Sequence, residues 1–351
     1  THLGMYGKLG RIFLKYAFND DLKQDEIAAH FGTDGEVEVS QDAEEFANDL
    51  EELGPTFVKL GQLLSTRPDL MPPAWMKALE RLQDEVEPFS SEEAFAIIEA
   101  ELGTSVDRLF REIDPKPLAA ASLGQVHVAT LQSSGKQVAV KVQRPGVRER
   151  IAEEMAALEE VAKFVEKHSK FGERYEPLRI VQQFKKAIFS ELDYNQEAEN
   201  LTELGDNMQE KSLLVVPRPV LDYSTDKVLT MEYISGTSLT HLSGVVHTEL
   251  DSHKLADELF SAYLKQVLVD GFFHADPHPG NLLLMQDRRL AILDLGMVGR
   301  VPNRMMDHLL QLLVAIAEGQ SSDVAAIAKR IGSEKKGFDI EQFEEAIIEV
   351  V

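Results

Sequence analysis

The spacing of hydrophobic residues changes character near residue 113. Before that point apolar residues recur at helical intervals between prolines and glycines, and no alternating stretch of useful length occurs. Residues 1–112 are therefore predicted to form a helical N-terminal extension. Beyond it, Gln125–Leu131 and Gln137–Gln143 alternate on either side of Ser133–Lys136, which predicts a β-hairpin.

The remaining pattern predicts a mixed domain followed by a mainly helical one. Two helices and two strands are expected after the hairpin, at about 147–169, 178–206, 214–222 and 227–234. From residue 236 onward the chain reads as helical, apart from a second short hairpin made of Leu282–Met285 and Leu290–Leu293. The predicted fold class is α+β, with domains at 1–112, 113–235 and 236–351.

Polar residues gather around the second hairpin. The run His274-Ala-Asp276-Pro-His278-Pro-Gly280-Asn281 precedes it, and Asp294 follows it. Phosphoryl transfer needs an acidic group near the attacking hydroxyl and oxygen ligands for magnesium. Asp276 and Asn281 have the spacing of the functional residues in H-R-D-x-x-x-x-N, and Asp294 falls where the D-F-G aspartate holds metal. We predict Asp276 near the nucleophile, Asn281 and Asp294 on Mg²⁺, and His274 as a residue that orients the loop. A polar loop with Asp294 as a turn residue is the alternative.

A lysine of the first hairpin is the candidate phosphate ligand. Strand alternation places Ala139 and Lys141 on one face, where the small residue leaves room for a purine and the ammonium reaches phosphates of ATP. An ordinary solvated strand lysine is the alternative. Lys141 needs a carboxylate partner, and on one continuous helix Glu197 and Glu191 lie on different sides. Glu197 is the favoured partner and Glu191 the alternative.

The turn before the first hairpin is rich in alanine where a kinase would carry glycines. Cβ atoms on Ala119, Ala120 and Ala121 narrow the allowed backbone, so this loop with Ser122 is predicted to be stiffer around the nucleotide than a glycine-rich loop. Packing alone would also explain these small residues. Met231 and Glu232, in the strand near 227–234, are assigned to the same nucleotide site.

A second unusual segment runs from Gly54 to Pro73. Its prolines bracket a helix of about three turns, on which Lys59 and Gln62 project together. Gly61 costs helix stability of order 1 kcal/mol, so we expect it to admit another backbone at close range. Glu191 and Asp193 are the expected partners of this helix, which we interpret as a regulatory gate. A surface helix with a snorkelling lysine is the alternative.

Composition limits the choice of partners. The net charge of −24 argues against nucleic acid, and the absence of cysteine removes disulfides and thiolate chemistry. No stretch approaches the roughly 20 apolar residues that span a bilayer, so the chain as given is expected to be soluble. It starts without methionine and stops within a helical pattern, so we expect both ends to be trimmed. Lys8, Arg11 and Lys15 form one basic amphipathic stretch, for which packing is favoured over a membrane-surface role.

Together these segments resemble the UbiB family of atypical, protein-kinase-like proteins linked to isoprenoid-quinone metabolism. The resemblance covers about residues 50–300 and rests on four features. They are the K-x-G-Q set of Lys59, Gly61 and Gln62; the alanine-rich loop; the E-x-D pair of Glu191 and Asp193, with Glu197; and the kinase-type residues Lys141, Asp276, Asn281 and Asp294.

The resemblance implies a two-lobed kinase-like fold, with 113–235 as N-lobe and 236–351 as a C-lobe cut short. It implies ATP and Mg²⁺ as ligands, an N-terminal extension that packs on the lobes and blocks the protein-substrate groove, and ATPase or small-molecule kinase activity. Isoprenoid lipid or a quinone precursor, and a membrane surface, are the partners it suggests. In the family the intact protein is often membrane-associated, in bacteria, mitochondria or plastids. A phosphotransferase of the aminoglycoside and choline kinase type, and a non-catalytic module switched by nucleotide, remain the alternatives.

Overall fold

The computed structural model describes residues 2–17, 40–68, 70–82, 86–168, 176–241, 252–275, 279–332 and 338–350. Contacts within the chain divide it into two compact units. The first holds Thr1–Asn195 and Val220–Thr230, and the second holds Gln196–Pro219 and Met231–Val351. Each unit is therefore built from two separate stretches of sequence, and the two are described in turn.

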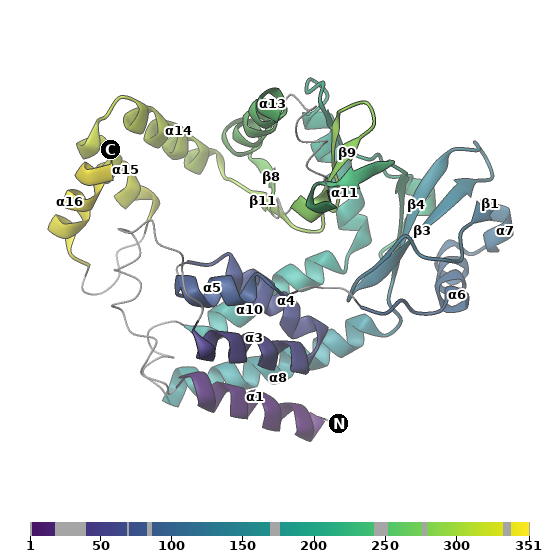
Figure 1. Cartoon of the computed structure of the whole chain (residues 1–351), viewed down its shortest axis with the longest axis horizontal. Helices are drawn as coiled ribbons and strands as arrows, with labels where there is room; N and C mark the ends of the chain where they lie inside the picture. The colour runs from purple at the N-terminus through teal and green to yellow at the C-terminus, as the bar shows by residue number, and fades with distance from the viewer. Residues whose placement is uncertain are drawn as a thin grey trace. The chain divides into compact units, whose positions relative to one another are not determined.

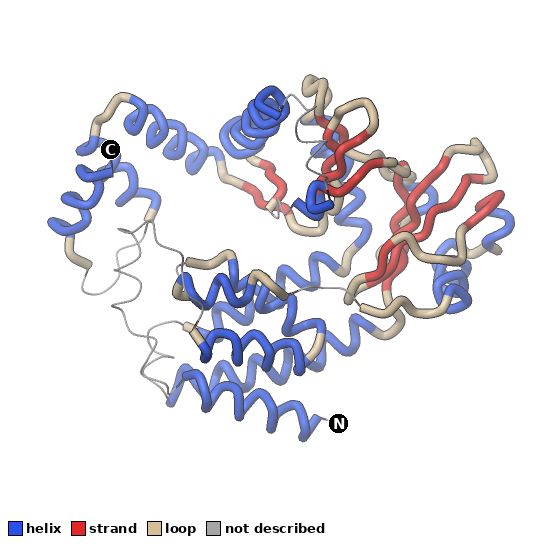
Figure 2. Tube along the Cα trace, in the orientation of Figure 1, coloured by secondary structure: helices blue, strands red, loops and turns tan. Residues whose placement is uncertain are grey.

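Helices make up most of the first unit, as the sequence predicts (Figures 1 and 2). Six of them pack together: α1 (His2–Ala17), α3 (Gln41–Leu53), α4 (Pro55–Ser65), α5 (Pro73–Leu79), α8 (Val147–His168) and α10 (Pro177–Glu191). The buried core between them includes Phe57 and Leu64 of α4, Met155 of α8 and Ile188 of α10. The apolar side chains of α4 therefore lie inside this core.

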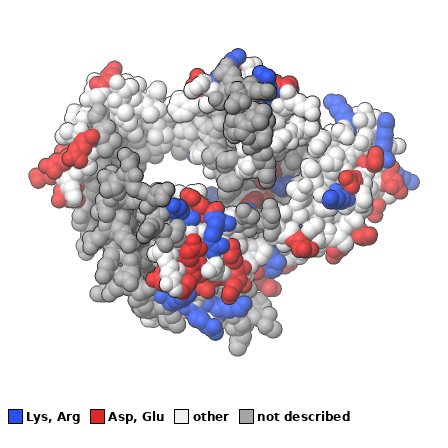
Figure 3. Space-filling view, in the orientation of Figure 1, with Lys and Arg blue, Asp and Glu red and all other residues white. Residues whose placement is uncertain are grey.

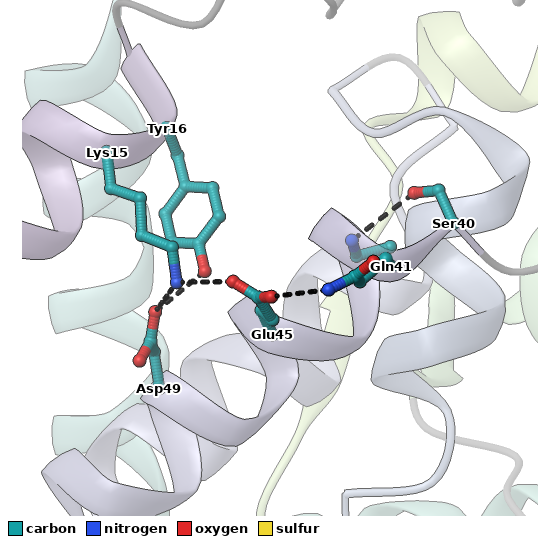
Figure 4. Close-up of polar contacts among 7 residues, drawn as sticks. Lys15, Tyr16, Ser40, Gln41, Glu45 and Asp49 are labelled. Carbon is teal, nitrogen blue, oxygen red and sulfur yellow. Dashed lines mark hydrogen bonds and ion pairs between the residues drawn. The ribbon is translucent and has the colours of Figure 1, made fainter.

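Helix α1 packs on α3 and α8 through its apolar side. Leu9 and Tyr16 are buried, and the Tyr16 ring meets Phe46 and Trp75 edge-on. At the end of the helix the Tyr16 hydroxyl donates to Asp49 Oδ2 at 2.7 Å, and Lys15 Nζ lies 2.9 Å from Glu45 and 3.1 Å from Asp49 (Figure 4). Burial raises the pKa of Tyr16, so its hydroxyl keeps its proton and remains a donor. Packing on the fold, the favoured prediction for this stretch, is what the structure has.

The sheet of the first unit confirms the first predicted hairpin. Its strands β3 (Gly124–Leu131) and β4 (Gln137–Gln143) are antiparallel over their whole length. They lie at the centre of the order β1-β3-β4-β6, with β2 also pairing β3. The other strands are β1 (Phe110–Ile113), β2 (Ala119–Ala120) and β6 (Val228–Glu232).

One face of this sheet is covered by α6 (Ser91–Leu102), with α7 (Val106–Leu109) beside it. A capping box of Ser90 and Glu93 starts α6, and its Ala94 and Ile98 pack on the buried valines of β4. The valines of the Val-Ala-Val-Lys strand are therefore used for packing, which leaves Ala139 and Lys141 on the opposite face.

The predicted helix 178–206 is wrong in one respect, because it is two helices. Helix α10 ends at Glu191, and α11 (Tyr194–Asn207) begins three residues later. Between them the Asp193 N–H bonds to the Ser190 carbonyl, and the Tyr194 N–H bonds to the Asp226 carbonyl. Glu191 and Glu197 therefore lie on separate helices.

The second unit carries small sheets between helices. A four-stranded sheet has the order β5-β10-β9-β7, and a two-stranded sheet pairs β11 with β8. Its strands are β5 (Leu214–Val215), β7 (Gly236–Ser238), β8 (Phe272–His274), β9 (Leu282–Met285), β10 (Leu290–Ile292) and β11 (Val298–Arg300). Its helices are most of α11, then α13 (Ser252–Lys265), α14 (Asn303–Ala317), α15 (Ser321–Ile331) and α16 (Ile340–Val350), with a π-helix at Gln266–Asp270.

Two sequence predictions in this unit need correction. The strand expected at 214–222 is only Leu214–Val215, followed by a bridge at Pro219 and a 3-10 helix at Leu221–Tyr223. That strand pairs in parallel with β10 and not with the sheet of the first unit. The part after residue 236 also holds more strand than predicted, because β7, β8 and β11 accompany the hairpin.

Charged side chains of both signs intermingle over the helices of the first unit on the face shown in Figure 3. Arg81 is an example, since its guanidinium bonds Glu44 and Glu51 at 3.1 and 3.0 Å. Among the residues that the structure describes, no helix is long and apolar enough to cross a bilayer.

Candidate functional site

In the first unit, Lys141 lies in a row of residues across the sheet. The register sets Val126 opposite Lys141 on one side and opposite Ala119 on the other. Because residues directly opposite in a sheet share a face, Ala119, Val126 and Lys141 lie on the face that also holds Ala139. The sheet therefore brings the predicted phosphate lysine and the start of the alanine-rich loop to one surface.

The alanine-rich loop is a tight β-turn and not an open loop. Ala119 and Ala120 form β2, and the Ala121 N–H donates to the Gly124 carbonyl at 2.8 Å, which leaves Ser122 and Leu123 as the turn. The Leu123 side chain is buried in the helical core, and its carbonyl accepts the Arg144 N–H at 2.8 Å. The loop is anchored at its tip by Leu123, and the stiffness expected from its alanines stays a prediction.

Ser122 stands out in this turn. It is 1% exposed, and its hydroxyl is buried without a hydrogen-bond partner within the described part of the chain. A buried hydroxyl left unpaired costs stability of about 1–3 kcal/mol. The turn therefore contains a hydroxyl group that is not hydrogen-bonded to any of the described residues.

The K-x-G-Q helix is tied to its neighbours by polar contacts. Lys59 Nζ lies 2.7 Å from Glu191 Oε1, and each side chain is 17% exposed. Gln62 Nε2 donates to the Leu82 carbonyl at 3.0 Å, so it does not share the partner of Lys59. Thr56 donates to the buried carboxylate of Glu154 on α8. This last contact carries no signal in the sequence, because a threonine and a glutamate 98 residues apart form no motif.

Gly61 does admit a close neighbour, although the neighbour is not a backbone. A Cβ at this position would lie 2.3 Å from Leu82 Cδ1 and 3.0 Å from Leu50 Cδ1. The expectation of backbone approach is therefore wrong. Leucine side chains from two directions fill the space that the missing methyl group leaves.

In the second unit, the predicted hairpin brings Asn281 and Asp294 to one end. Leu282 of β9 pairs with Ile292 of β10, and the Leu293 N–H donates to the Asn281 carbonyl at 2.8 Å. Asn281 thus precedes one strand and Asp294 follows the other. Asp276, the predicted catalytic acid, lies outside the described residues.

His274 links this end of the hairpin to the strand before it. The side chain is 1% exposed, its Nε2 lies 2.8 Å from the Asp294 carbonyl, and its Nδ1 lies 3.3 Å from the Tyr263 hydroxyl. A ring that carries a proton on Nε2 donates to the carbonyl, and Nδ1 lies within reach of the tyrosine hydroxyl. The predicted orienting role of His274 would act through this contact with the Asp294 carbonyl.

Asp294 occupies a backbone region that favours glycine, with φ at 50°. Asp and Asn are the other residues that enter this region with low cost, and such positions cluster at functional sites. Its Oδ1 accepts the Gly296 N–H at 3.1 Å, and Asn200 of α11 donates to the Leu295 carbonyl at 2.9 Å. The two contacts hold the turn from both sides.

The donors at this turn can be tested against magnesium. No group of three or more His, Asp or Glu residues suited to a metal occurs in the described ranges. Magnesium, however, is commonly held by one or two carboxylates, with water and substrate phosphates completing its shell. Asp294 and the amide oxygen of Asn281 fit that donor set, whereas a metal cage made entirely by protein is not what these residues provide.

The other predicted residues divide between the units. Glu197 is 1% exposed and belongs to the second unit, so its pairing with Lys141 of the first unit stays a prediction. Glu232 accepts the Arg218 N–H through its carboxylate at 3.2 Å, and Met231 forms a bridge with Pro219. Sequence reasoning missed Tyr194, whose ring lies beneath Lys141. Its only signal is a place next to the E-x-D pair.

Comparison with known proteins identifies the family. The model of the ABC1 atypical kinase-like domain matches residues 81–328. Protein ACTIVITY OF BC1 COMPLEX KINASE 3, chloroplastic, from Arabidopsis thaliana is 39% identical over 93% of this chain and 45% of its own length. A protein named probable protein kinase UbiB from Cellvibrio japonicus is 38% identical over 85% of this chain and 54% of its own.

A solved structure supports the fold. The complex of Rv3197 with erythromycin from Mycobacterium tuberculosis covers 93% of this chain and 82% of its own, at 23% identity and a TM-score of 0.60. The fold is therefore kinase-like, as the resemblance implies. The chain spans about half the length of the curated relatives it matches.

Proposed function

Because the chain belongs to the family of ABC1 atypical kinase-like domains and is similar to proteins named UbiB, we propose that it binds Mg-ATP and acts as an atypical kinase or ATPase. Its role would be to support isoprenoid-quinone metabolism of the ubiquinone type. The observation that carries the proposal is the turn of the second unit, where the buried His274 holds the Asp294 carbonyl at the same hairpin end as Asn281. A buried histidine whose ring contacts the Asp294 carbonyl suits a carboxylate that must be held still.

Each residue then has a distinct task. Lys141 binds phosphate oxygens, Glu197 pairs with Lys141, and Asp276 takes the proton of the attacking hydroxyl. Asn281 and Asp294 hold magnesium, which when bound neutralises charge on the phosphates. The turn Ala119–Ser122 borders the phosphates, where the unpaired Ser122 hydroxyl is an available donor. Ala139, Met231 and Glu232 surround the base.

The contacts of the first unit support one choice between two carboxylates. Glu191 already lies 2.7 Å from Lys59, so its charge is compensated by the K-x-G-Q helix. A buried carboxylate needs compensation as well, and Glu197 is buried. We assign Glu197 to Lys141, and Glu191 to the gate.

In the proposed gate, α4 controls access to the nucleotide site. Lys59, Gly61 and Gln62 belong to one short helix that is tied by polar contacts of Lys59 and Gln62 and packed against leucines at Gly61. A helix held this way moves as a body or not at all. The N-terminal extension that carries it would also block the protein-substrate groove, so that the acceptor is water or a small molecule.

The membrane and lipid parts of the proposal rest on the resemblance. The intact protein would work at a membrane surface on an isoprenoid lipid or quinone precursor. Relatives carry names from chloroplasts and from bacteria, and the same chemistry suits either compartment.

The test is the melting temperature of the chain with ATP, with and without Mg²⁺, for the parent and Asp294→Asn. Asparagine tolerates the positive φ and can still accept the Gly296 N–H, so the substitution removes charge and leaves the turn in place. Ligand at 100 times its dissociation constant adds about 2.7 kcal/mol, a shift of several degrees. Asp307→Asn, on an exposed position of α14, is the matched control.

The parent and the control should show a magnesium-dependent shift that Asp294→Asn lacks. An equal shift in all three would show that Asp294 does not hold the metal. No shift of the melting temperature in the parent would argue against nucleotide binding and favour a module without catalysis.

A further inference from the structure

Tyr194 is completely buried in the first unit, at the first position of α11. Its backbone is fixed because its N–H donates to the Asp226 carbonyl at 3.2 Å. The preceding Leu192 is held as well, since its carbonyl accepts Gln143 Nε2 of β4 at 2.9 Å. The ring is therefore tied to the sheet before any of its own contacts are considered.

The ring of Tyr194 lies under the sheet face that carries Lys141. Lys141 Nζ is 5.0 Å from the ring centroid, within the range of a cation–π contact. At the other end of the ring, a Cβ on Gly124 would lie 2.7 Å from the Tyr194 hydroxyl. Gly124 begins β3 and faces Gln143 of β4, so the ring extends along the sheet from the end of the alanine-rich turn to the lysine.

We propose that Tyr194 is a positioning residue, whose ring face holds the Lys141 ammonium where it can meet the phosphates of the nucleotide. The role rests on the proposed function, because it needs Lys141 to bind phosphate. A long lysine side chain has many rotamers, and a fixed aromatic face under its end narrows them before the ligand arrives. The contact is made by the ring and not by the hydroxyl.

That distinction separates two substitutions. Tyr194→Phe keeps the ring face, so the position of Lys141 and nucleotide affinity should change little. Tyr194→Leu removes the ring, so Lys141 should lose the restraint that the ring adds to its other contacts, and Mg-ATP should bind about tenfold more weakly. Tyr194→Met, whose flexible unbranched side chain can adapt to the space without an aromatic face, serves as a second variant because a leucine could destabilise the fold. Phe184→Leu, a buried aromatic on α10, is the matched control for lost ring packing.

The first measurement needs no nucleotide. Lysines of the full chain are methylated with ¹³C, and the Lys141 resonance is assigned by its loss in Lys141→Arg. An ammonium above a ring is displaced upfield by the ring current. The displacement should be present in the parent, Tyr194→Phe and Phe184→Leu, and absent in Tyr194→Leu and Tyr194→Met. The second measurement is calorimetric titration of the unmethylated variants with Mg-ATP.

Each outcome has a separate meaning. An unchanged Lys141 resonance in both non-aromatic variants would overturn the contact. A changed resonance with unchanged affinity would overturn the positioning role. Weakening in Phe184→Leu equal to that in Tyr194→Leu would assign the effect to general loss of packing. If the parent binds no Mg-ATP, the proposed function fails and the role of the ammonium with it, while the resonance still reports on the contact itself.

Discussion

The substitution Gly61→Ala tests how α4 is packed. In a helix, alanine is favoured over glycine by about 1 kcal/mol. The new methyl group would lie 2.3 Å from Leu82 Cδ1 and 3.3 Å from Leu79 Cδ2, in a buried site where both leucines are less than a tenth exposed. Overpacking of this kind costs about 1–3 kcal/mol. We expect a net loss of about 1 kcal/mol, which lowers the melting temperature of a unit of about 200 residues by about 2–4 °C.

Thermal and urea unfolding of the parent and Gly61→Ala measure this loss. Gly10→Ala on α1 is the matched control, because nothing lies within 4 Å of its Cβ, so it should gain up to about 1 kcal/mol. Adding Leu82→Val shortens the side chain that collides, so the double variant should lose less than the two single variants together. Gly61→Ala as stable as Gly10→Ala would refute the packing argument. If α4 is the gate, Gly61→Ala also changes the Mg-ATP affinity of the folded protein.

Two further predictions concern ion pairs of the first unit. A double-mutant cycle of Lys59→Met and Glu191→Gln should give a coupling free energy of about 1–2 kcal/mol in urea unfolding, because each side chain of the pair is only 17% exposed. A coupling near zero would show that the contact is not made in solution. The hydrogen bond from Lys227 lowers the pKa of Glu101, so this carboxylate contributes stability above its unfolded pKa of about 4.3 and loses it as the pH falls through the lower folded value. Glu101→Gln should therefore be less stable than the parent by up to about 1 kcal/mol at pH 7, and the difference should disappear as the pH falls below the folded pKa of Glu101. A difference that does not depend on pH would contradict this assignment.

The sequence predicted the local elements of the site better than their partners. Both hairpins follow from alternation and turn residues, and their ends are within a residue or two of those predicted. The break between α10 and α11 was missed, although Asp193 followed three residues later by Gln196 is a common sequence signal for a helix start. Acidic helical periodicity on both sides hid that signal.

Contacts between distant segments could be predicted only where two motifs suggested each other. The pairing of Lys59 with Glu191 was expected because a motif lysine and an acidic pair suggested each other. The Tyr194 ring under Lys141, the Leu82 methyl at Gly61 and the parallel pairing of β5 with β10 depend on how packed elements approach, and no spacing in the chain encodes that approach.

The first unit is built from two separate stretches of sequence, and this has a consequence for its synthesis on the ribosome. Strand β6 completes the sheet beside β4, and the Lys227 and Asp226 carbonyls of that return accept the N–H groups of Gln143 and Tyr194. These residues belong to Val220–Thr230, which the ribosome makes only after the first stretch of the second unit. A nascent chain that ends at Asn195 therefore exposes the edge of β4 and leaves Tyr194 without its anchor, an aggregation-prone state. Stalling or truncation between residues 195 and 230 should be more damaging to this protein than an interruption after residue 230.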